Sequence, residues 1–368
     1  MDHLMPSSVT MQDIANAADV SKTTVSLALR DDPRLREITR QRIQKIALEM
    51  GYRINPVISS LLALREKRTL QEFRNTIGLV NASGKGEMLE GLFTFHEWVK
   101  GCKRRASQVG YGFDEFLLEE TLPNRLPKLL EARNIRGLIV ASVLKDGVLP
   151  LEFSHLWNRF SCVVVGIPTT LPRLHVIRND QYFTAYKAVQ AVLALGYTRP
   201  ALVVHPKIDA LLDYRYSAGF RAALHDFPRD QIIPTFEFSN RTPKPFETWF
   251  QKHRPDVIIT LHGAVREWLL SMNLHIPAEV GLVHLDLTPN LGGWSGMKQN
   301  NDLVGAAAVD MLIAQMNRNE FAPPAFSKCV LIESTWVPGA TLIQRNTKSH
   351  PRSHYAIAAR LKRDTRSF

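Results

Sequence analysis

The sequence predicts an α/β protein in which a small all-α helix-turn-helix headpiece precedes a two-lobed core of parallel sheets wound by helices. From residue 77 onward, short apolar runs alternate with amphipathic helical stretches, the pattern of parallel strands covered by helices. This part spans about 260 residues, which exceeds one compact sheet and favours two lobes with a cleft between them. Residues 9–51 break the pattern, because three helical segments follow one another there with no strand.

The core is expected to contain eight strands with helices between them. The strands are predicted at 77–80, 112–118, 137–141, 162–166, 201–204, 256–261, 280–285 and 330–334. The clearest helices are predicted at 97–109, 126–132, 183–195, 214–226, 264–272 and 303–316. Gly110, Gly196 and Asn273 lie just past helix ends, where such residues commonly terminate a helix.

The headpiece carries two helix-start signals. Thr10-Met11-Gln12-Asp13 is a capping box, and Ser21 is an N-cap before a second helix over 22–30. A third helix ends at Gly51. Two helices joined by a tight turn and packed on a third form the geometry that lays the second helix into the DNA major groove. The outer face of that helix carries Lys22, Thr23, Ser26, Leu27 and Arg30.

A fourth short helix is expected from Pro56, because Asn55-Pro56 combines an N-cap with proline at the first helical position. It includes Leu61 and ends before the charged linker 65–74. An apolar helix of this length is marginal alone, so its twin in a dimer or the DNA should order it.

The formal net charge of +11 favours a polyanionic partner. The excess lies at both ends: residues 1–76 hold twelve Lys/Arg against nine Asp/Glu, and the tail 346–368 holds six against one. No apolar run has the roughly 18 residues of a membrane span, and no export signal precedes the headpiece, so a cytoplasmic, nucleoid-associated protein is expected. The 3 cysteines show neither disulfide nor zinc-site spacing.

Several segments resemble the lactose-repressor (LacI/GalR) family of bacterial transcription regulators. The headpiece segments are V-T-M-Q-D-I-A-N-A-A-D-V-S-K-T-T-V-S-L-A-L-R (9–30) and G-Y-R-I-N-P (51–56). The core segments are R-G-L-I-V (136–140), A-L-G-Y-T-R-P-A-L-V (194–203), A-G-F-R-A-A-L (218–224), I-P-A-E-V-G-L-V-H-L-D (276–286) and N-D-L-V-G-A-A-A-V-D-M-L (301–312). The resemblance implies a headpiece, a hinge helix and a periplasmic-binding-protein-like core whose chain crosses between lobes three times.

The resemblance implies that Lys22 and Thr23 read bases and that Thr24 and Ser26 bind phosphates. Leu27 replaces a basic residue of the family and would meet a thymine methyl instead, so the operator sequence should differ. Leu61 matches a leucine that such proteins insert into the minor groove, with packing on the core lobe as its alternative role. The expected DNA contacts are Thr10, Ser21, Lys22, Thr23, Thr24, Ser26, Leu27, Arg30, Tyr52, Asn55 and Leu61.

The resemblance also implies a small-molecule effector in the cleft. Asp286 matches the family aspartate that binds ligand hydroxyls or amines, and Phe95 matches an aromatic residue of the cleft. A family arginine falls on Tyr216, with Arg215 beside it, and a family Asn-Asp pair is His262-Gly263 here. These departures predict a ligand unlike a typical sugar, or the loss of ligand binding. Strand-end capping by Asp286 and an ordinary loop role for His262 remain alternatives.

Other protein classes fit less well. Gly84-Lys85-Gly86 lacks dinucleotide-binding spacing, Gly293-Trp294-Ser295-Gly296 is not a nucleophile elbow, and the histidines at 253, 262, 275 and 284 are scattered. We therefore expect no enzyme, no cofactor and no metal. A solute-binding protein shares the core, but the headpiece argues against it. An activator or a corepressor-dependent regulator also remains open.

The sequence thus predicts a homodimeric transcription regulator, with a repressor as the favoured interpretation. Its affinity for a near-palindromic double-stranded DNA operator is expected to respond to a small molecule such as a sugar. The predicted domains are the headpiece 1–54, the hinge helix and linker 55–76, the core 77–345 and a basic tail 346–368 without order. Within the core, the first lobe is expected at about 77–177 and 300–333, and the second at about 178–297 and 334–345.

Overall fold

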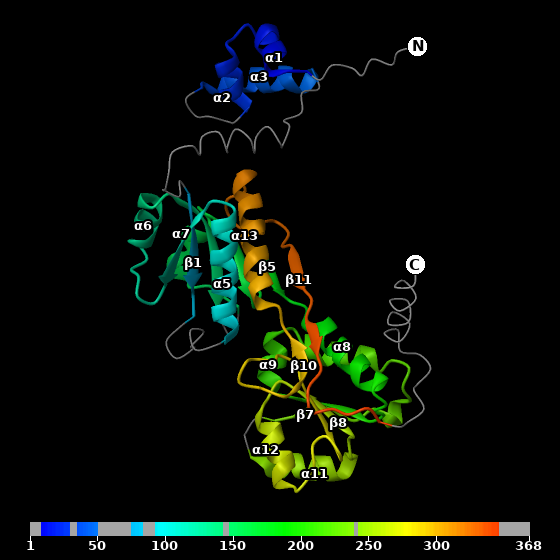
Figure 1. Cartoon of the computed structure of the whole chain (residues 1–368). Helices are drawn as coiled ribbons and strands as arrows, with labels where there is room; N and C mark the ends of the chain where they lie inside the picture. Colours follow the sequence, from blue (N-terminus) through cyan, green and yellow to red (C-terminus); the bar gives the residue numbers. More distant parts are fainter. Residues whose placement is uncertain are drawn as a thin grey trace, which may run out of the picture. The chain divides into compact units, whose positions relative to one another are not determined.

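The computed structural model describes residues 9–29, 35–50, 75–83, 93–142, 147–238 and 242–345. The chain divides into two compact units, residues 1–72 and 73–368. The first is the headpiece, and the second contains two sheets with their helices (Figure 1). In the described residues, no helix is long and apolar enough to cross a membrane.

The described part of the headpiece contains α1 (Met11–Ala18), α2 (Lys22–Leu29) and α3 (Glu37–Glu49). The predicted capping box is confirmed: Asp13 N donates to Thr10 Oγ1, and Thr10 N donates to Asp13 Oδ2 at 2.8 Å. The three helices share a small apolar core. Its buried members are Ile14, Ala15, Ala18, Val25, Ala28, Ile43 and Ala47.

The first sheet of the core has the strand order β11-β5-β4-β3-β1-β2, all parallel. Its strands are β1 (Thr76–Asn81), β2 (Gly112–Leu117), β3 (Ile135–Ser142), β4 (Ser161–Gly166), β5 (His175–Asn179) and β11 (Cys329–Ile332). One face packs on α5 (Phe93–Gln108) and α13 (Asn301–Asn317). The other packs on α6 (Leu126–Ala132) and α7 (Ser154–Trp157), which follows a single 3₁₀ turn (Leu151–Phe153).

Helices α5 and α13 pack backbone against backbone. A Cβ on Gly101 would lie 1.9 Å from the carbonyl oxygen of Asp302, and one on Gly305 would lie 2.1 Å from that of Trp98. Cys102 Sγ also donates to Gly305 O at 3.3 Å. The close approach therefore requires glycine on both helices.

The second sheet has the order β12-β10-β9-β8-β6-β7, with β12 antiparallel to β10. Its strands are β6 (Pro200–Val204), β7 (Phe236–Glu237), β8 (Val257–Thr260), β9 (Gly281–His284), β10 (Ser295–Lys298) and β12 (Thr335–Val337). Helices α8 (Gln181–Ala194) and α10 (Arg215–Ala223) cover one face, and α11 (Pro243–His253) and α12 (Ala264–Ser271) cover the other. Helix α9 (Pro206–Leu211) follows β6, and a 3₁₀ turn (Arg229–Gln231) precedes β7.

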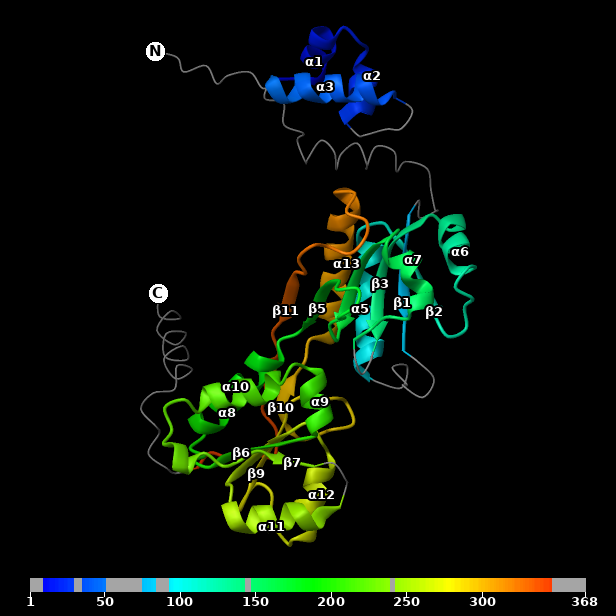
Figure 2. The ribbon, with the colours of Figure 1, turned by 180° about the vertical axis from the view of Figure 1, so that it is seen from behind.

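We call the two sheets with their helices the first and second lobes. The chain passes between them after β5, after β10 and between β11 and β12 (Figure 2). Hydrogen bonds join the passages: Asn179 Nδ2 donates to Asn301 Oδ1 at 2.6 Å, and the hydroxyls of Thr184 and Ser334 are 2.6 Å apart. The lobes thus meet at three adjacent polypeptide connections.

The predicted fold class is confirmed, with three helices in the described part of the headpiece and two parallel-sheet lobes in the core. The sequence analysis did not predict the strands β5, β7, β10 and β12 or the helices α7, α9 and α11. Strand β5 was missed because it buries His175, Arg178 and Asn179, which are unusual in a central strand.

Candidate DNA-binding surface and effector site

Helix α2 presents the residues predicted to read DNA. Its buried side is Val25 and Ala28, whereas Lys22 and Thr23 at its start are exposed. Ser21 caps the helix, because its Oγ accepts from Thr24 N at 3.1 Å. The polar start of α2 is therefore held by a cap on one side and by the headpiece core on the other.

Other predicted DNA-contact residues also form hydrogen bonds within the headpiece. The Thr10 hydroxyl donates to Asp13 at 2.7 Å, and the Ser21 hydroxyl is 2.8 Å from that of Thr24. Leu27 is half-buried, as is Ser26, which already has a polar partner. Four predicted contacts lie outside the described residues: Arg30, Tyr52, Asn55 and Leu61.

Two side chains of α3 fix the orientation of the helices, and the sequence analysis did not single them out. Arg42 Nη2 donates to Ala18 O at 3.1 Å, at the end of α1. Gln44 Nε2 donates to Ala28 O at 2.9 Å, near the end of α2. Each satisfies a helix-end carbonyl that has no partner within its own helix.

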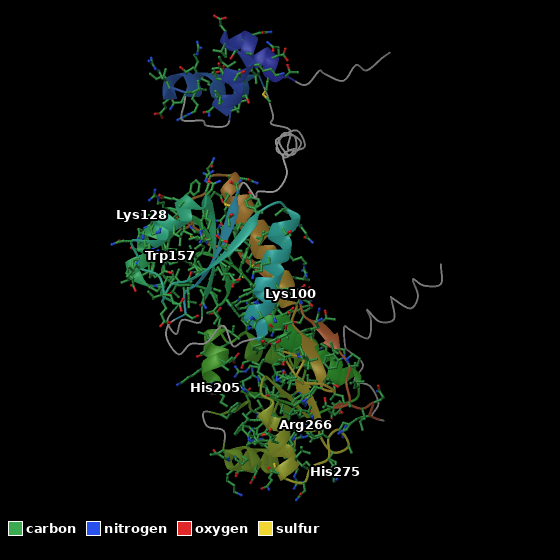
Figure 3. All side chains as sticks on the ribbon, turned by 60° about the vertical axis from the view of Figure 1, so that its left-hand side comes forward. Lys100, Lys128, Trp157, His205, Arg266 and His275 are labelled. Atoms are coloured by element: carbon green, nitrogen blue, oxygen red, sulfur yellow. The ribbon has the colours of Figure 1, made fainter. Side chains whose placement is uncertain are left out.

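In the core, two of the predicted effector residues, His262 and Asp286, lie at the carboxyl edge of the second sheet, together with His205, which was not predicted. His205 follows β6 (Figure 3), His262 follows β8, and Asp286 follows β9. Because these strands are parallel, their carboxyl ends meet at one edge, where ligands of α/β proteins commonly bind. The predicted residues His262 and Asp286 therefore lie at the same edge of the second sheet.

Asp286 lies at a contact between the lobes. Its carboxyl group lies near the side chain of Thr94, which belongs to α5 of the first lobe and lowers the pKa of Asp286. Its Oδ1 is buried and reaches no hydrogen-bond partner. Burial has the larger effect and raises the pKa of Asp286 to about 7. An unpaired buried carboxylate oxygen is costly, so it is a candidate ligand contact.

His284 supports the same loop. Its Nδ1 accepts from Asp286 N at 3.1 Å, and burial lowers the pKa of this histidine to about 4. The imidazole is therefore neutral near pH 7 and acts as an acceptor for the backbone that carries Asp286.

Tyr216 occupies the position of the family arginine and is fully inside the second lobe, 2 % exposed. Its hydroxyl accepts from Gln299 Nε2 at 2.7 Å. Burial and the nearby Asp286 raise the pKa of the Tyr216 phenol, so it stays neutral. Asp209 also lies near it, with Oδ2 accepting from Ser217 and a buried Oδ1 that has no partner. Sequence reasoning missed Asp209, Gln299 and Thr94.

Aromatic rings adjoin His262. The ring of Phe238, just after β7, is 4.6 Å from that of His262, 5.6 Å from that of His205 and 5.3 Å from that of Trp268, centroid to centroid. Such rings offer apolar faces to a ligand as well as to each other. Phe238 was missed because the two-residue β7 gives almost no strand pattern.

The two remaining predicted effector residues are already engaged. Phe95 is buried in the apolar core between the first sheet and its helices α5 and α13. Arg215 Nη2 donates to Asp180 Oδ1 at 2.9 Å, beside the first passage between the lobes. Their roles in effector binding stay predictions.

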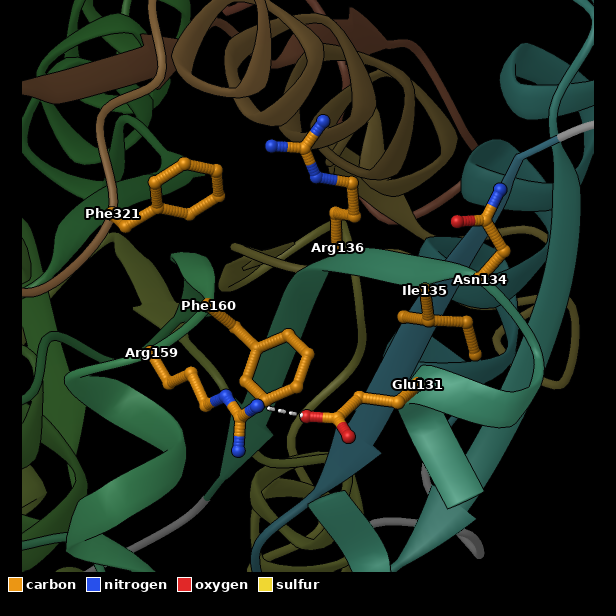
Figure 4. Close-up of a pocket in the computed structure, with 7 residues that line it drawn as sticks. All are labelled: Glu131, Asn134, Ile135, Arg136, Arg159, Phe160 and Phe321. Atoms are coloured by element: carbon orange, nitrogen blue, oxygen red, sulfur yellow. Dashed lines mark ion pairs between the residues drawn. The ribbon is translucent and has the colours of Figure 1, made fainter. Parts of the chain in front are cut away.

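A separate hollow of about 310 Å³ lies at the amino edge of the first sheet (Figure 4). It is lined by Glu131, Asn134, Ile135, Arg136, Arg159, Phe160 and Phe321. Arg159 pairs with Glu131, and the guanidinium of Arg136 lies 5.2 Å from the ring centre of Phe321. Ile135 is the first residue of β3, so this hollow lies at the amino ends of the strands of the first sheet. The effector is expected at the carboxyl ends of the strands instead. Among the described residues, no group of three metal-ligating side chains occurs.

Residues 10–55 match the family model described as "Bacterial regulatory proteins, lacI family". The chain is 25% identical to the HTH-type transcriptional regulator PtxS of Pseudomonas plecoglossicida over 327 residues, with 85% of this chain and 90% of that protein covered. It is 22% identical to the ribose operon repressor of Escherichia coli K12, with 84% and 93% covered. These matches place a LacI-type DNA-binding domain at residues 10–55, and the similarity to such regulators extends over most of the chain.

Two solved structures of transcription regulators share the fold. A lac repressor dimer bound to operator and an anti-inducer has a TM-score of 0.53 at 20% identity, covering 92% of this chain and 100% of that one. A cellobiose complex of the regulator CelR has a TM-score of 0.53 at 15% identity, covering 90% and 99%. With its LacI-type domain at residues 10–55, the protein is a DNA-binding transcriptional regulator.

Proposed function

We propose that this regulator is a repressor whose operator affinity is set by a small molecule bound between its two lobes, next to Asp286. One observation carries the proposal. Asp286, from the second lobe, contacts Thr94 of the first lobe and still keeps a buried oxygen without a partner. A ligand that donates to this oxygen would therefore act at a residue whose environment depends on the relative position of the lobes.

The ligand class is proposed from the site and from the relatives together. Asp209 and Asp286 offer acceptors, and Phe238 and His262 offer ring faces, which suits a sugar or a sugar-like molecule. The related E. coli protein is named a ribose repressor, and CelR was solved with cellobiose.

We further propose that two copies of the chain bind one near-palindromic operator, with the start of each α2 in the major groove. Lys22 and Thr23 are exposed there, on a helix whose other side is the headpiece core. The related lac repressor was solved as a dimer on its operator. Such a protein would act in the cytoplasm, where the chromosome lies.

The test is a fluorescence-anisotropy titration of a duplex selected from random DNA, with and without each member of a sugar panel. We expect one sugar to weaken operator binding about tenfold or more, and Asp286→Ala to abolish that response while binding the free operator as tightly as the original chain. Asp230→Ala, which removes an exposed carboxylate of the same lobe, is the matched control and should respond normally.

Two outcomes contradict the proposal. If Asp286→Ala still responds to the sugar, Asp286 is not in the site. If a sugar tightens rather than weakens operator binding, the protein works by corepression and the proposed sign is wrong.

A further inference from the structure

Arg178 is a charged side chain inside the first lobe. It lies on β5, one residue before the chain begins its first passage to the second lobe. Strand β5 pairs with β4 on one side and with β11 on the other, and Arg178 is only 3 % exposed. A guanidinium stays charged even when it is buried, so this position requires compensation.

The compensation is incomplete. Arg178 Nη2 donates to Asp213 Oδ2 at 2.9 Å, and the side chain of Asp213 is 63% exposed. The other two guanidinium nitrogens, Nε and Nη1, are buried and reach no acceptor. Arginine offers donors only, so these N–H groups can be satisfied only by an acceptor that comes from elsewhere. Leaving them unpaired costs stability, and such groups in a native structure call for an explanation.

The position of Arg178 connects it to both lobes. Asp213 lies between α9 and α10 of the second lobe, on a turn where Asp213 and Tyr214 both have positive φ, 57° and 56°. The ion pair between Arg215 and Asp180 lies beside the same passage of the chain. An anion that accepts from Nη1 or Nε leaves Asp213 in contact with Nη2, so it would bind where the two lobes already touch.

The exposed arginines of the hollow in Figure 4 are poorer candidates. Arg159 already pairs with Glu131, and Arg136 lies on the ring of Phe321, where water solvates it. Exposed ion pairs contribute little, whereas a buried guanidinium with unused donors gains much more from an anion.

We infer that Arg178 is an anion-binding residue at the junction of the lobes, and that the effector carries a carboxylate or phosphate group. The second part rests on the proposed function, in which a small molecule between the lobes controls operator binding. An acidic sugar derivative combines both requirements: hydroxyls for Asp286 and an anionic group for Arg178.

The test compares the thermal unfolding of the full-length chain in about 50 mM sodium phosphate with that in sodium chloride of equal ionic strength. We expect phosphate to raise the melting temperature by roughly 3 °C, the shift for a ligand at several times its Kd. In Arg178→Met the shift should disappear, while the variant itself unfolds in chloride at or above the temperature of the original chain, because a poorly compensated buried charge is gone. Arg136→Gln, the matched control in the surface hollow, should keep the shift.

A second variant distinguishes the loss of anion binding from a folding defect of Arg178→Met. Arg178→Lys keeps the charge with fewer donors and should show a reduced but measurable shift. Equal melting temperatures of the original chain in phosphate and chloride would overturn the inference, and so would a shift that survives in Arg178→Met or is lost in Arg136→Gln.

Isothermal titration then identifies the source of the anion. The full-length chain should bind D-gluconate or D-glucose 6-phosphate at least tenfold more tightly than D-glucose, and Arg178→Met should remove that preference. A preference for neutral D-glucose would overturn the effector part. If a neutral sugar releases the operator and phosphate does not stabilise the chain, this inference fails and the proposed function stands. If phosphate binds at Arg178 but no ligand alters operator affinity, the anion site stands and the proposed function fails.

Discussion

Replacing Asp286 by asparagine should stabilise the protein at alkaline pH and leave its stability unchanged under acidic conditions. The amide has nearly the same shape as the carboxylate and keeps an oxygen for the contact with Thr94. It has no charge to bury. The variant therefore isolates the cost of ionising Asp286 within the folded chain.

The magnitude follows from the pKa of Asp286, which burial raises from 3.8 to about 7. Because the folded state holds this proton more tightly than the unfolded state, the original chain loses roughly 1.4 kcal/mol of stability per pH unit as the pH rises from about 4 to 7. The variant has no such loss. Its advantage should thus grow from near zero at pH 4 to about 4 kcal/mol above pH 7.

His284 acts in the same pH range with the opposite sign. Burial lowers its pKa from 6.5 to about 4, so its contribution to stability is lost as the pH falls through that interval. Both chains retain His284, and its effect therefore cancels in the difference between them.

Calorimetry of both chains at pH 4, 6 and 8 measures this difference. We expect the melting temperature of Asp286→Asn to exceed that of the original chain by about 5–10 °C at pH 8 and to match it at pH 4. A constant difference across the pH range, or a less stable variant at pH 8, would refute a buried carboxylate with a raised pKa.

Three further predictions concern the headpiece and the core. Thr23→Ala should weaken specific operator binding about 5- to 150-fold in an anisotropy titration while nonspecific binding changes little; an equal loss on both DNAs would contradict base reading. Gln44→Ala should cost the headpiece about 1 kcal/mol in chemical unfolding, because it removes the hydrogen bond to the end of α2; an unchanged midpoint would show that water replaces the bond. Gly305→Ala should destabilise the core by about 3 kcal/mol or more, because its Cβ would lie 2.1 Å from a carbonyl oxygen of α5. The control Gly292→Ala should leave the stability unchanged, because a Cβ there would have nothing within 4 Å. Similar melting temperatures for the two variants would contradict the close packing of α5 and α13.

Local signals explain what the sequence predicted well. The capping box at Thr10 and the N-cap at Ser21 each depend on residues within one helical turn, and both are confirmed. The alternation of apolar runs and helices likewise predicted the α/β core, because each run is buried on both faces of a parallel sheet. Helix α5 begins at Phe93, four residues before its predicted start, and the sequence offers no Ser, Thr, Asp or Asn just before Phe93 to indicate that start.

Long-range contacts explain what the sequence did not predict. Strand β5 carries Arg178 and Asn179, whose partners Asp213 and Asn301 are 35 and 122 residues away. No local sequence pattern predicts contacts between residues so far apart in the chain. The contact of Asp286 with Thr94 and that of Tyr216 with Gln299 also join segments that are distant along the chain. The resemblance to the LacI family located Asp286 and Tyr216, but only the structure shows which side chains surround them.

The most direct test of the account is selection of bound duplexes from random DNA, followed by titration of the selected site at several salt concentrations. The full-length chain and a shorter chain that begins at Phe73, the start of the second unit, are compared. We predict that only the full-length chain enriches a near-palindromic site, and that it keeps a preference for this site as salt weakens nonspecific binding. Enrichment by both chains, or by neither, would contradict sequence-specific recognition by the headpiece.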